Sequence, residues 1–84
     1  MLATGYQLAA ARALIGLDQV KLAEMAGLSA NTIRSMEASR GGAIAGRAAN
    51  VQAVQRALEA SGVEFLNHGQ PGVRLMQAKQ RSDT

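Results

Sequence analysis

The stretch from Gln19 to Glu37, QVKLAEMAGLSANTIRSME, constrains what this chain can fold into more than any other segment. Leu22, Ala23 and Ala26 lie three and four residues apart, so they share one face of a first helix. Gly27 follows at once, where the chain must leave that helix and a positive φ is useful. The first half of the stretch therefore predicts a short amphipathic helix that ends in a tight turn.

A second helix is predicted directly after this turn. Ser29 can accept hydrogen bonds from the free amides that begin a helix. Ile33 and Met36 then form an apolar stripe, and the small side chain of Ala23 allows the two helices to pack closely. This combination is the helix-turn-helix pattern, in which the second helix enters the major groove of DNA. A helical hairpin with only a structural role would satisfy part of the pattern, but DNA binding is the interpretation that we favour.

One set of residues carries a family resemblance, and all of its members lie between positions 12 and 37. They are Arg12, Gly16, Leu17, Gln19, Leu22, Ala23, Ala26, Gly27, Leu28, Ser29, Thr32, Ile33 and Glu37. This set resembles the phage-repressor-like helix-turn-helix regulators of the XRE, or Cro/C1, family. The resemblance implies a mainly α fold, namely a four-helix lambda-repressor-like DNA-binding domain. It also implies a transcriptional regulator, a repressor or autoregulator, that binds an inverted-repeat operator in double-stranded DNA as a homodimer.

Length and composition limit the chain to one small domain. Its 84 residues include one Phe, one Tyr and no Trp, so the core is expected to be thin and a partner subunit would help to stabilise it. There is no cysteine, and no apolar run approaches the roughly 20 residues of a membrane span. The N-terminus also lacks the basic segment of a signal peptide. We therefore expect a cytoplasmic protein that joins the nucleoid through DNA binding.

Catalytic and cofactor chemistry find no support in the residue pattern. Hydrolysis needs a nucleophile with a base, paired carboxylates or a metal, and none of these groupings is present in the sequence. His68 is the only histidine and has no second His, Cys or acidic cluster beside it. We expect His68 to be a turn residue, and we expect neither an enzyme nor a cofactor.

The charges near the second motif helix are mostly positive. Arg34, Arg40 and Arg47 fall together with one acid, Glu37, among them. If Glu37 is turned inward, this end of the motif presents a basic edge to phosphate. The formal net charge of +3 is weak evidence for nucleic-acid binding when taken alone.

Arg12 is an unusual residue for its position. A first helix is predicted from the N-cap Thr4 to about Ile15, and Arg12 falls on the same side as its apolar residues Leu8 and Ala11. From composition alone, a surface arginine that extends its charge into water is the simpler interpretation. The family resemblance instead implies that Arg12 pairs with Glu37 in the core as a structural ion pair, in which each partner needs the other.

The second motif helix is expected from about Ala30 to Ala38, with its polar residues facing out. Asn can bond adenine, Arg can bond guanine, and Ala can contact a thymine methyl group. In relatives, the position of Gln19 contacts a phosphate and braces this helix, and the positions of Ser29, Ala30, Asn31 and Ser35 reach base edges. The predicted DNA-binding residues are Gln19, Ser29, Ala30, Asn31, Thr32, Arg34, Ser35, Arg40 and Arg47. Whether Arg34 reads a base or a phosphate stays open.

Residues 39–49 form a Gly-rich segment in which Arg40 and Arg47 flank the glycines. Backbone amides in such a loop can approach phosphate, and the alternative is a flexible linker with no function. Asn50 is the predicted N-cap of a fourth helix that runs to Ser61.

Two short strands are predicted at 63–66 and 73–75, separated by a turn segment at 67–72. Glu64 and Arg74 are placed to pair across this hairpin. A two-stranded hairpin is marginal alone, so it must pack on the helices or pair with another subunit. We expect it to contribute to a homodimer through Val63, Phe65, Val73 and Leu75. The single domain then spans 1–76, and 77–84 is a flexible tail.

A second function from a different class stays open. A domain with this motif can serve as an antitoxin or antiactivator that binds a regulatory partner protein. The modest net charge and the small residue at Ala30 keep this alternative in view. Salt distinguishes the two, because DNA binding weakens steeply as salt rises.

Overall fold

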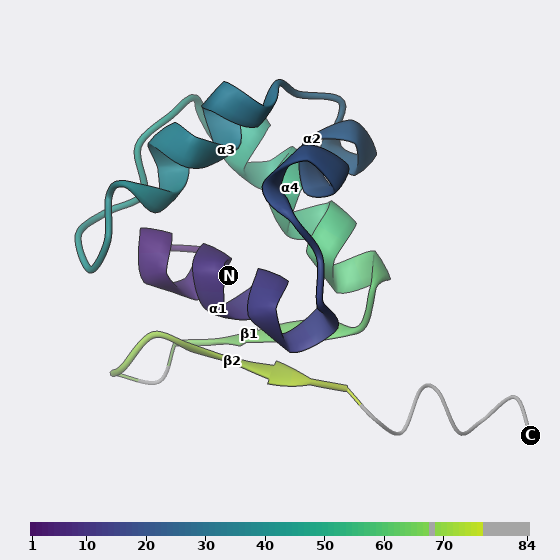
Figure 1. The fold of residues 1–84 in the computed structure, drawn as a ribbon. Helices are drawn as coiled ribbons and strands as arrows, with labels where there is room; N and C mark the ends of the chain where they lie inside the picture. Colours follow the sequence, from purple (N-terminus) through teal and green to yellow (C-terminus); the bar gives the residue numbers. More distant parts are fainter. Residues whose placement is uncertain (68, 77–84) are drawn as a thin grey trace, which may run out of the picture.

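The computed structural model describes residues 1–67 and 69–76, so His68 and the predicted tail 77–84 lie outside the described residues. Within them, four helices precede two strands: α1 (Gly5–Ile15), α2 (Gln19–Ala26), α3 (Ala30–Glu37), α4 (Ala48–Ala60), β1 (Val63–Leu66) and β2 (Gly72–Leu75). In Figure 1, α1 lies between the other helices and the hairpin of β1 and β2. The expected mainly helical chain with a β-hairpin at its end is confirmed. Within residues 1–67 and 69–76, no helix is long and apolar enough to cross a membrane.

Side-chain caps begin the first three helices, and those at Thr4 and Ser29 were expected from the sequence. Thr4, Asp18 and Ser29 accept hydrogen bonds from the backbone amide three residues further on, at 3.1, 2.7 and 3.2 Å respectively. Gly16 and Gly27 end α1 and α2 with φ values of 66° and 72°, a left-handed conformation that favours glycine. The turns around α2 are therefore fixed by local chemistry alone.

The start of α4 differs from the prediction. We expected Asn50 as the N-cap, but α4 begins at Ala48 and Arg47 holds the cap position without a side-chain hydrogen bond. The two alanines that precede Asn50 have the highest helix propensity of any residue, so the helix extends over them. The helix does not begin earlier, because the backbone of the cap residue Arg47 is extended and Gly46 before it has a φ of 127°.

The core draws one or more side chains from nearly every element. Its fully buried members are Leu8, Leu22, Ile33, Met36, Leu58, Val54 and Val63. Small residues at Ala11 and Ala23 are also buried, which lets α1 and α2 approach the helices that they contact. The buried faces of α2 and α3 are those that the apolar spacing predicted.

The hairpin packs on the helices of its own chain. Val63 pairs with Leu75 and Phe65 with Val73 across the antiparallel strands, so these four side chains share one face. Val63 and Phe65 are buried, and Val73 and Leu75 are half-buried. Of these four residues, which are expected at a dimer interface, Val63 and Phe65 belong to the core of their own chain and Val73 packs against it. Leu75 lies on the same face of the hairpin. Pairing of two chains through the strand edges stays a prediction.

The opposite face of the hairpin carries the predicted pair of Glu64 and Arg74. Their strands align them directly, and Nη2 of Arg74 lies 2.7 Å from Oε1 of Glu64. Both side chains are well exposed, so the pair contributes at most about 1 kcal/mol to stability.

Gln7 fastens the hairpin to α1 and is a contact that sequence reasoning missed. Its buried Nε2 donates to the carbonyl oxygen of Gly72 at 3.0 Å and to Oδ1 of Asn67 at 3.1 Å. Its Oε1 accepts from the amides of Ala3 and Thr4 at 2.7 and 3.1 Å. The spacing of Thr4 and Gln7 is that of a capping box, which signals the helix start but not the distant strands.

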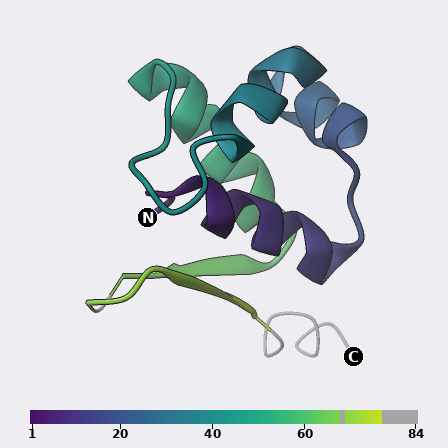
Figure 2. The same cartoon turned by 60° about the vertical axis from the view of Figure 1, so that its left-hand side comes forward.

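The segment between α3 and α4 is anchored to the N-terminal residues, which lie beside it in Figure 2. The amide of Tyr6 donates to the carbonyl oxygen of Arg40, and the amide of Ile44 donates to that of Ala3, both at 2.9 Å. The amide of Ala45 donates to Oγ of Ser39 at 2.8 Å. These bonds hold the Gly-rich segment in one defined path.

The closest approach between α1 and the end of α3 occurs at Gly5. A Cβ atom there would lie 2.7 Å from three backbone atoms of residues 36–40. Gly5→Ala is therefore expected to lower the free energy of unfolding by about 1–3 kcal/mol in urea denaturation followed by circular dichroism. Gly41→Ala is the control, because its Cβ would meet only the ring of Tyr6, at 3.4 Å. Equal losses in the two variants would contradict this account of the contact.

Candidate nucleic-acid interface

The helix α3 has one buried face and one open polar face. Ile33 and Met36 are buried against the core, whereas Asn31, Arg34 and Ser35 are exposed. The turn after α2 and the cap at Ser29 fix where α3 begins, and therefore which of its residues face out. The structure thus brings three of the predicted DNA-binding residues onto a single solvent-facing surface.

Arg12 and Glu37 form a two-point ion pair between α1 and the end of α3. Nε of Arg12 lies 2.6 Å from Oε2 of Glu37, and Nη2 donates to Oε1 at 3.0 Å. Nη1 donates to the carbonyl oxygen of Leu17 at 3.0 Å. The side chains are only 22% and 13% exposed, and the hydrogen bond to Glu37 raises the pKa of Arg12 above its usual value. Arg12 therefore remains charged and holds the carboxylate inward.

Gln19 joins this pair from α2. Its Nε2 donates to Oε1 of Glu37 at 3.0 Å, and the side chain is half-buried at the first residue of the helix. One carboxylate therefore receives hydrogen bonds from two other helices, through Arg12 on α1 and Gln19 on α2. This hydrogen bond joins the start of α2 to the end of α3, whereas the contact of Gln19 with a phosphate stays a prediction.

The inward turn of Glu37 leaves the nearby arginines without a competing acid. Arg34, Arg40 and Arg47 are exposed, and within the described part of the chain none of them lies within ion-pair distance of a carboxylate. Arg40 follows the last turn of α3, and Arg47 is the N-cap residue of α4. The predicted basic edge required Glu37 to be turned inward, and within the described residues it is.

The residues at the start of α3 are engaged with one another. Ser29 and Thr32 approach to 3.0 Å between their hydroxyl oxygens, and the amide of Thr32 donates to the same Ser29 oxygen. Ser29 is exposed, while Ala30 and Thr32 are half-buried. Ser29 can meet an outside ligand while it caps the helix, because a hydroxyl both donates and accepts.

A contact that sequence reasoning did not find joins two of the exposed residues. Nη1 of Arg34 donates a hydrogen bond to Oδ1 of Asn31. Their separation of three residues places them side by side on a helix, which is the signal that could have predicted the pair.

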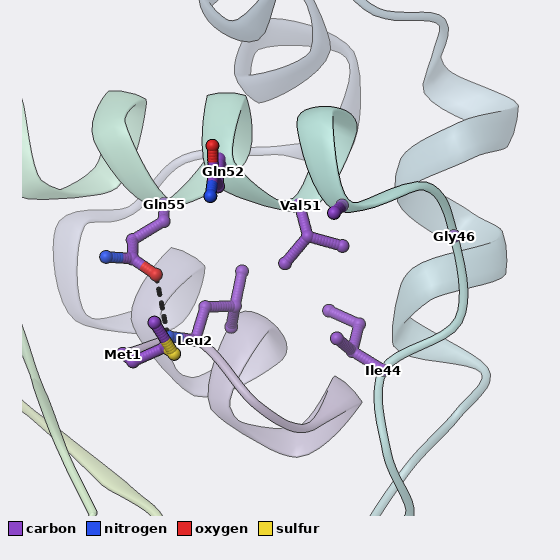
Figure 3. Close-up of a pocket in the computed structure, with 8 residues that line it drawn as sticks. Met1, Leu2, Ile44, Gly46, Val51, Gln52 and Gln55 are labelled. Carbon is purple, nitrogen blue, oxygen red and sulfur yellow. Dashed lines mark hydrogen bonds between the residues drawn. The ribbon is translucent and has the colours of Figure 1, made fainter.

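A shallow cavity of about 330 Å³ lies between the N-terminus, the Gly-rich segment and α4 (Figure 3). Met1, Leu2, Ile44 and Val51 give it an apolar lining, and Oε1 of Gln55 is occupied by the amide of Leu2 at 2.9 Å. No ionisable side chain lines it. In the described residues, no three His, Cys, Asp or Glu side chains gather where a metal ion could bind. Among the described residues, the side chains that line this cavity are therefore apolar or amide groups.

The ion pair can be tested by its effect on stability. Glu37→Ala leaves Arg12 without its partner and Gln19 without its acceptor, so we expect a loss of about 1.5–3 kcal/mol in the free energy of unfolding. Glu59→Ala is the control, because Glu59 is an exposed helix residue bonded only to Gln55 within the described chain, and it should cost under about 0.5 kcal/mol. Thermal denaturation that gives equal losses would refute the structural role of Glu37.

Comparisons with known proteins add no assignment to this geometry. No family model matches the chain, and no curated protein sequence matches it. The resemblance carried by residues 12–37 therefore enters below as one support for a proposal.

Proposed function

We propose that this protein is a sequence-specific transcriptional regulator that binds double-stranded DNA. In this proposal α2 and α3 form a helix-turn-helix within a four-helix domain of the lambda-repressor type. One observation carries it: α3 turns Asn31, Arg34 and Ser35 outward while Glu37 is drawn inward to Arg12. Side chains of these outward types recognise base edges or phosphates in the major groove. The family resemblance of residues 12–37 supports the same function.

The charge arrangement supports contact with the phosphate backbone. A free carboxylate at the end of α3 would repel phosphate, but Glu37 is bound by Arg12 and Gln19. Arg40 has a φ of 51°, which residues other than glycine rarely adopt. The two glycines that follow, which adopt such a conformation easily, do not occupy this position. An arginine held in such a conformation points to a role for its side chain, and phosphate binding is the role that its exposure and charge support.

The length of α3 supports a homodimer on DNA. Its eight residues span about 12 Å, so one copy reaches only a few base pairs. Two copies related by a two-fold axis would place their α3 helices about 34 Å apart in successive major grooves. The operator is then an inverted repeat. A small repressor or autoregulator in the cytoplasm, bound to the nucleoid, fits this arrangement by analogy of fold.

A protein-interaction module, such as an antitoxin or antiactivator, is the second candidate. Tyr6 and Leu14 on α1 are 60% and 43% exposed. They are eight residues apart in the sequence, so they lie toward the same side of the helix. Exposed apolar side chains that gather in one patch mark protein-interaction sites, and Tyr6 and Leu14 are the candidates for such a patch on α1. This surface lies on a different helix from the polar face of α3, so the two candidates make separable predictions.

Selection of bound duplexes from a random DNA pool tests the first candidate. We expect enrichment of an inverted repeat whose half-site centres are about 10 base pairs apart. The affinity for the selected duplex should fall with salt by about 0.9 log units per log unit for each phosphate contacted. Fluorescence anisotropy at several salt concentrations measures this slope. A pool without enrichment, together with salt-insensitive capture of a partner protein, would favour the interaction module instead.

A further inference from the structure

The hydrogen bond between Arg34 and Asn31 directs an arginine that is otherwise open to solvent. Nη1 of Arg34 donates to Oδ1 of Asn31, and both side chains are exposed. Within the described residues Arg34 has no ion-pair partner. Asn31 is the second residue of α3, so the bond turns the guanidinium back along the outer face toward the first turn of the helix.

The direction of the guanidinium distinguishes between the two possible targets of Arg34, a base edge and a phosphate. When the second helix of the motif enters the major groove, residues of its N-terminal part contact the base edges. Side chains of a helix also lean toward its N-terminus. A guanidinium held beside Asn31 therefore lies toward the bases. A phosphate contact would instead require the side chain to leave this pair and extend toward the DNA backbone.

The same bond changes what Asn31 can recognise. Reading adenine requires Oδ1 to accept from the N6 amino group while Nδ2 donates to N7. Here Oδ1 already accepts from Arg34, and a positive guanidinium stands beside it. The oxygen retains a second lone pair, but the positive guanidinium beside it favours a base edge made of acceptors over the amino donor of adenine. Guanine offers two acceptors, O6 and N7, on its major-groove edge.

We propose that Arg34 reads a guanine in the major groove and that Asn31 is a positioning residue that reads no base itself. The inference rests on the proposed DNA-binding function. It adds which base is read and which of the two residues reads it. Guanidinium carries five N–H donors, and Asn31 uses one of them. The others suffice for the two-point bond to O6 and N7 of guanine.

The test uses the full chain and a duplex selected by the wild-type protein. Each guanine of one half-site is replaced in turn by 7-deazaguanine, which keeps Watson–Crick pairing but lacks the N7 acceptor. At one guanine the substitution is expected to weaken wild-type binding about 5-fold or more. The variant Arg34→Ala should show no further loss at that guanine, because the contact is already absent.

The role of Asn31 needs a separate readout. Asn31→Ala is expected to reduce discrimination for the same guanine by less than Arg34→Ala does, and to leave the preference at every adenine unchanged. Arg56→Ala is the matched control, since it removes an exposed arginine from α4 and should leave all base preferences intact. Circular dichroism melts establish that the variants are folded, as expected for exposed side chains.

Three results would overturn the inference. If Arg34→Ala weakens all duplexes equally and lowers the salt slope by about 0.9, Arg34 holds a phosphate. If Asn31→Ala relaxes the preference at an adenine, Asn31 reads that base. Both results leave the proposed DNA-binding function standing. A wild-type protein that selects no duplex sequence would instead overturn the proposed function together with the inference.

Discussion

The ion pair of Arg12 with Glu37 is the interaction on which the rest of the arrangement depends. It joins the first helix to the end of the third, and Gln19 adds a hydrogen bond from the second. A carboxylate at this place would otherwise face the same surface as Arg34 and Arg40 and oppose any anion there. The pair therefore contributes to the packing of three helices and also sets the sign of the charge on the open side of α3.

The hairpin and the N-terminus complete a core that the helices alone leave thin. Val63 and Phe65 are buried beneath α1 and α4, and Gln7 bonds both the turn region and the start of α1. The N-terminal residues also bind the segment that carries Arg40, through the amides of Tyr6 and Ile44. The N-terminal residues thus hold the segment between α3 and α4, which carries Arg40 and Arg47.

Local features of this fold could be predicted from the sequence, whereas contacts between residues far apart in the sequence could not. The caps at Thr4, Asp18 and Ser29 and the glycine ends of α1 and α2 follow from residues within one turn, so pattern alone finds them. The predicted start of α4 at Asn50 was wrong, because the high helix propensity of the two preceding alanines outweighed the capping signal of Asn50. The reach of Gln7 to residues 67 and 72 depends on tertiary packing, which no local pattern encodes.

The candidate site divides in the same way. Apolar spacing predicted the outward face of α3, and the family resemblance supplied the partners Arg12 and Glu37. Alternation in the strands predicted the apolar face of the hairpin but does not say whether the covering surface belongs to the same chain, so the part of these residues in a dimer stays a prediction. The bond between Asn31 and Arg34 depends on rotamers, which the sequence does not specify.

Mapping by nuclear magnetic resonance tests the central claim most directly, namely that the open face of α3 and its flanking arginines form one DNA-binding surface. A ¹⁵N-labelled sample of the full chain would be titrated with the selected duplex. We expect saturable amide shifts that concentrate at residue 19, in 29–35 and in 38–47, with little change on the exposed face of the hairpin at Glu64 and Arg74. Shifts that concentrate on the hairpin or on Tyr6 and Leu14, with α3 unaffected, would contradict the account.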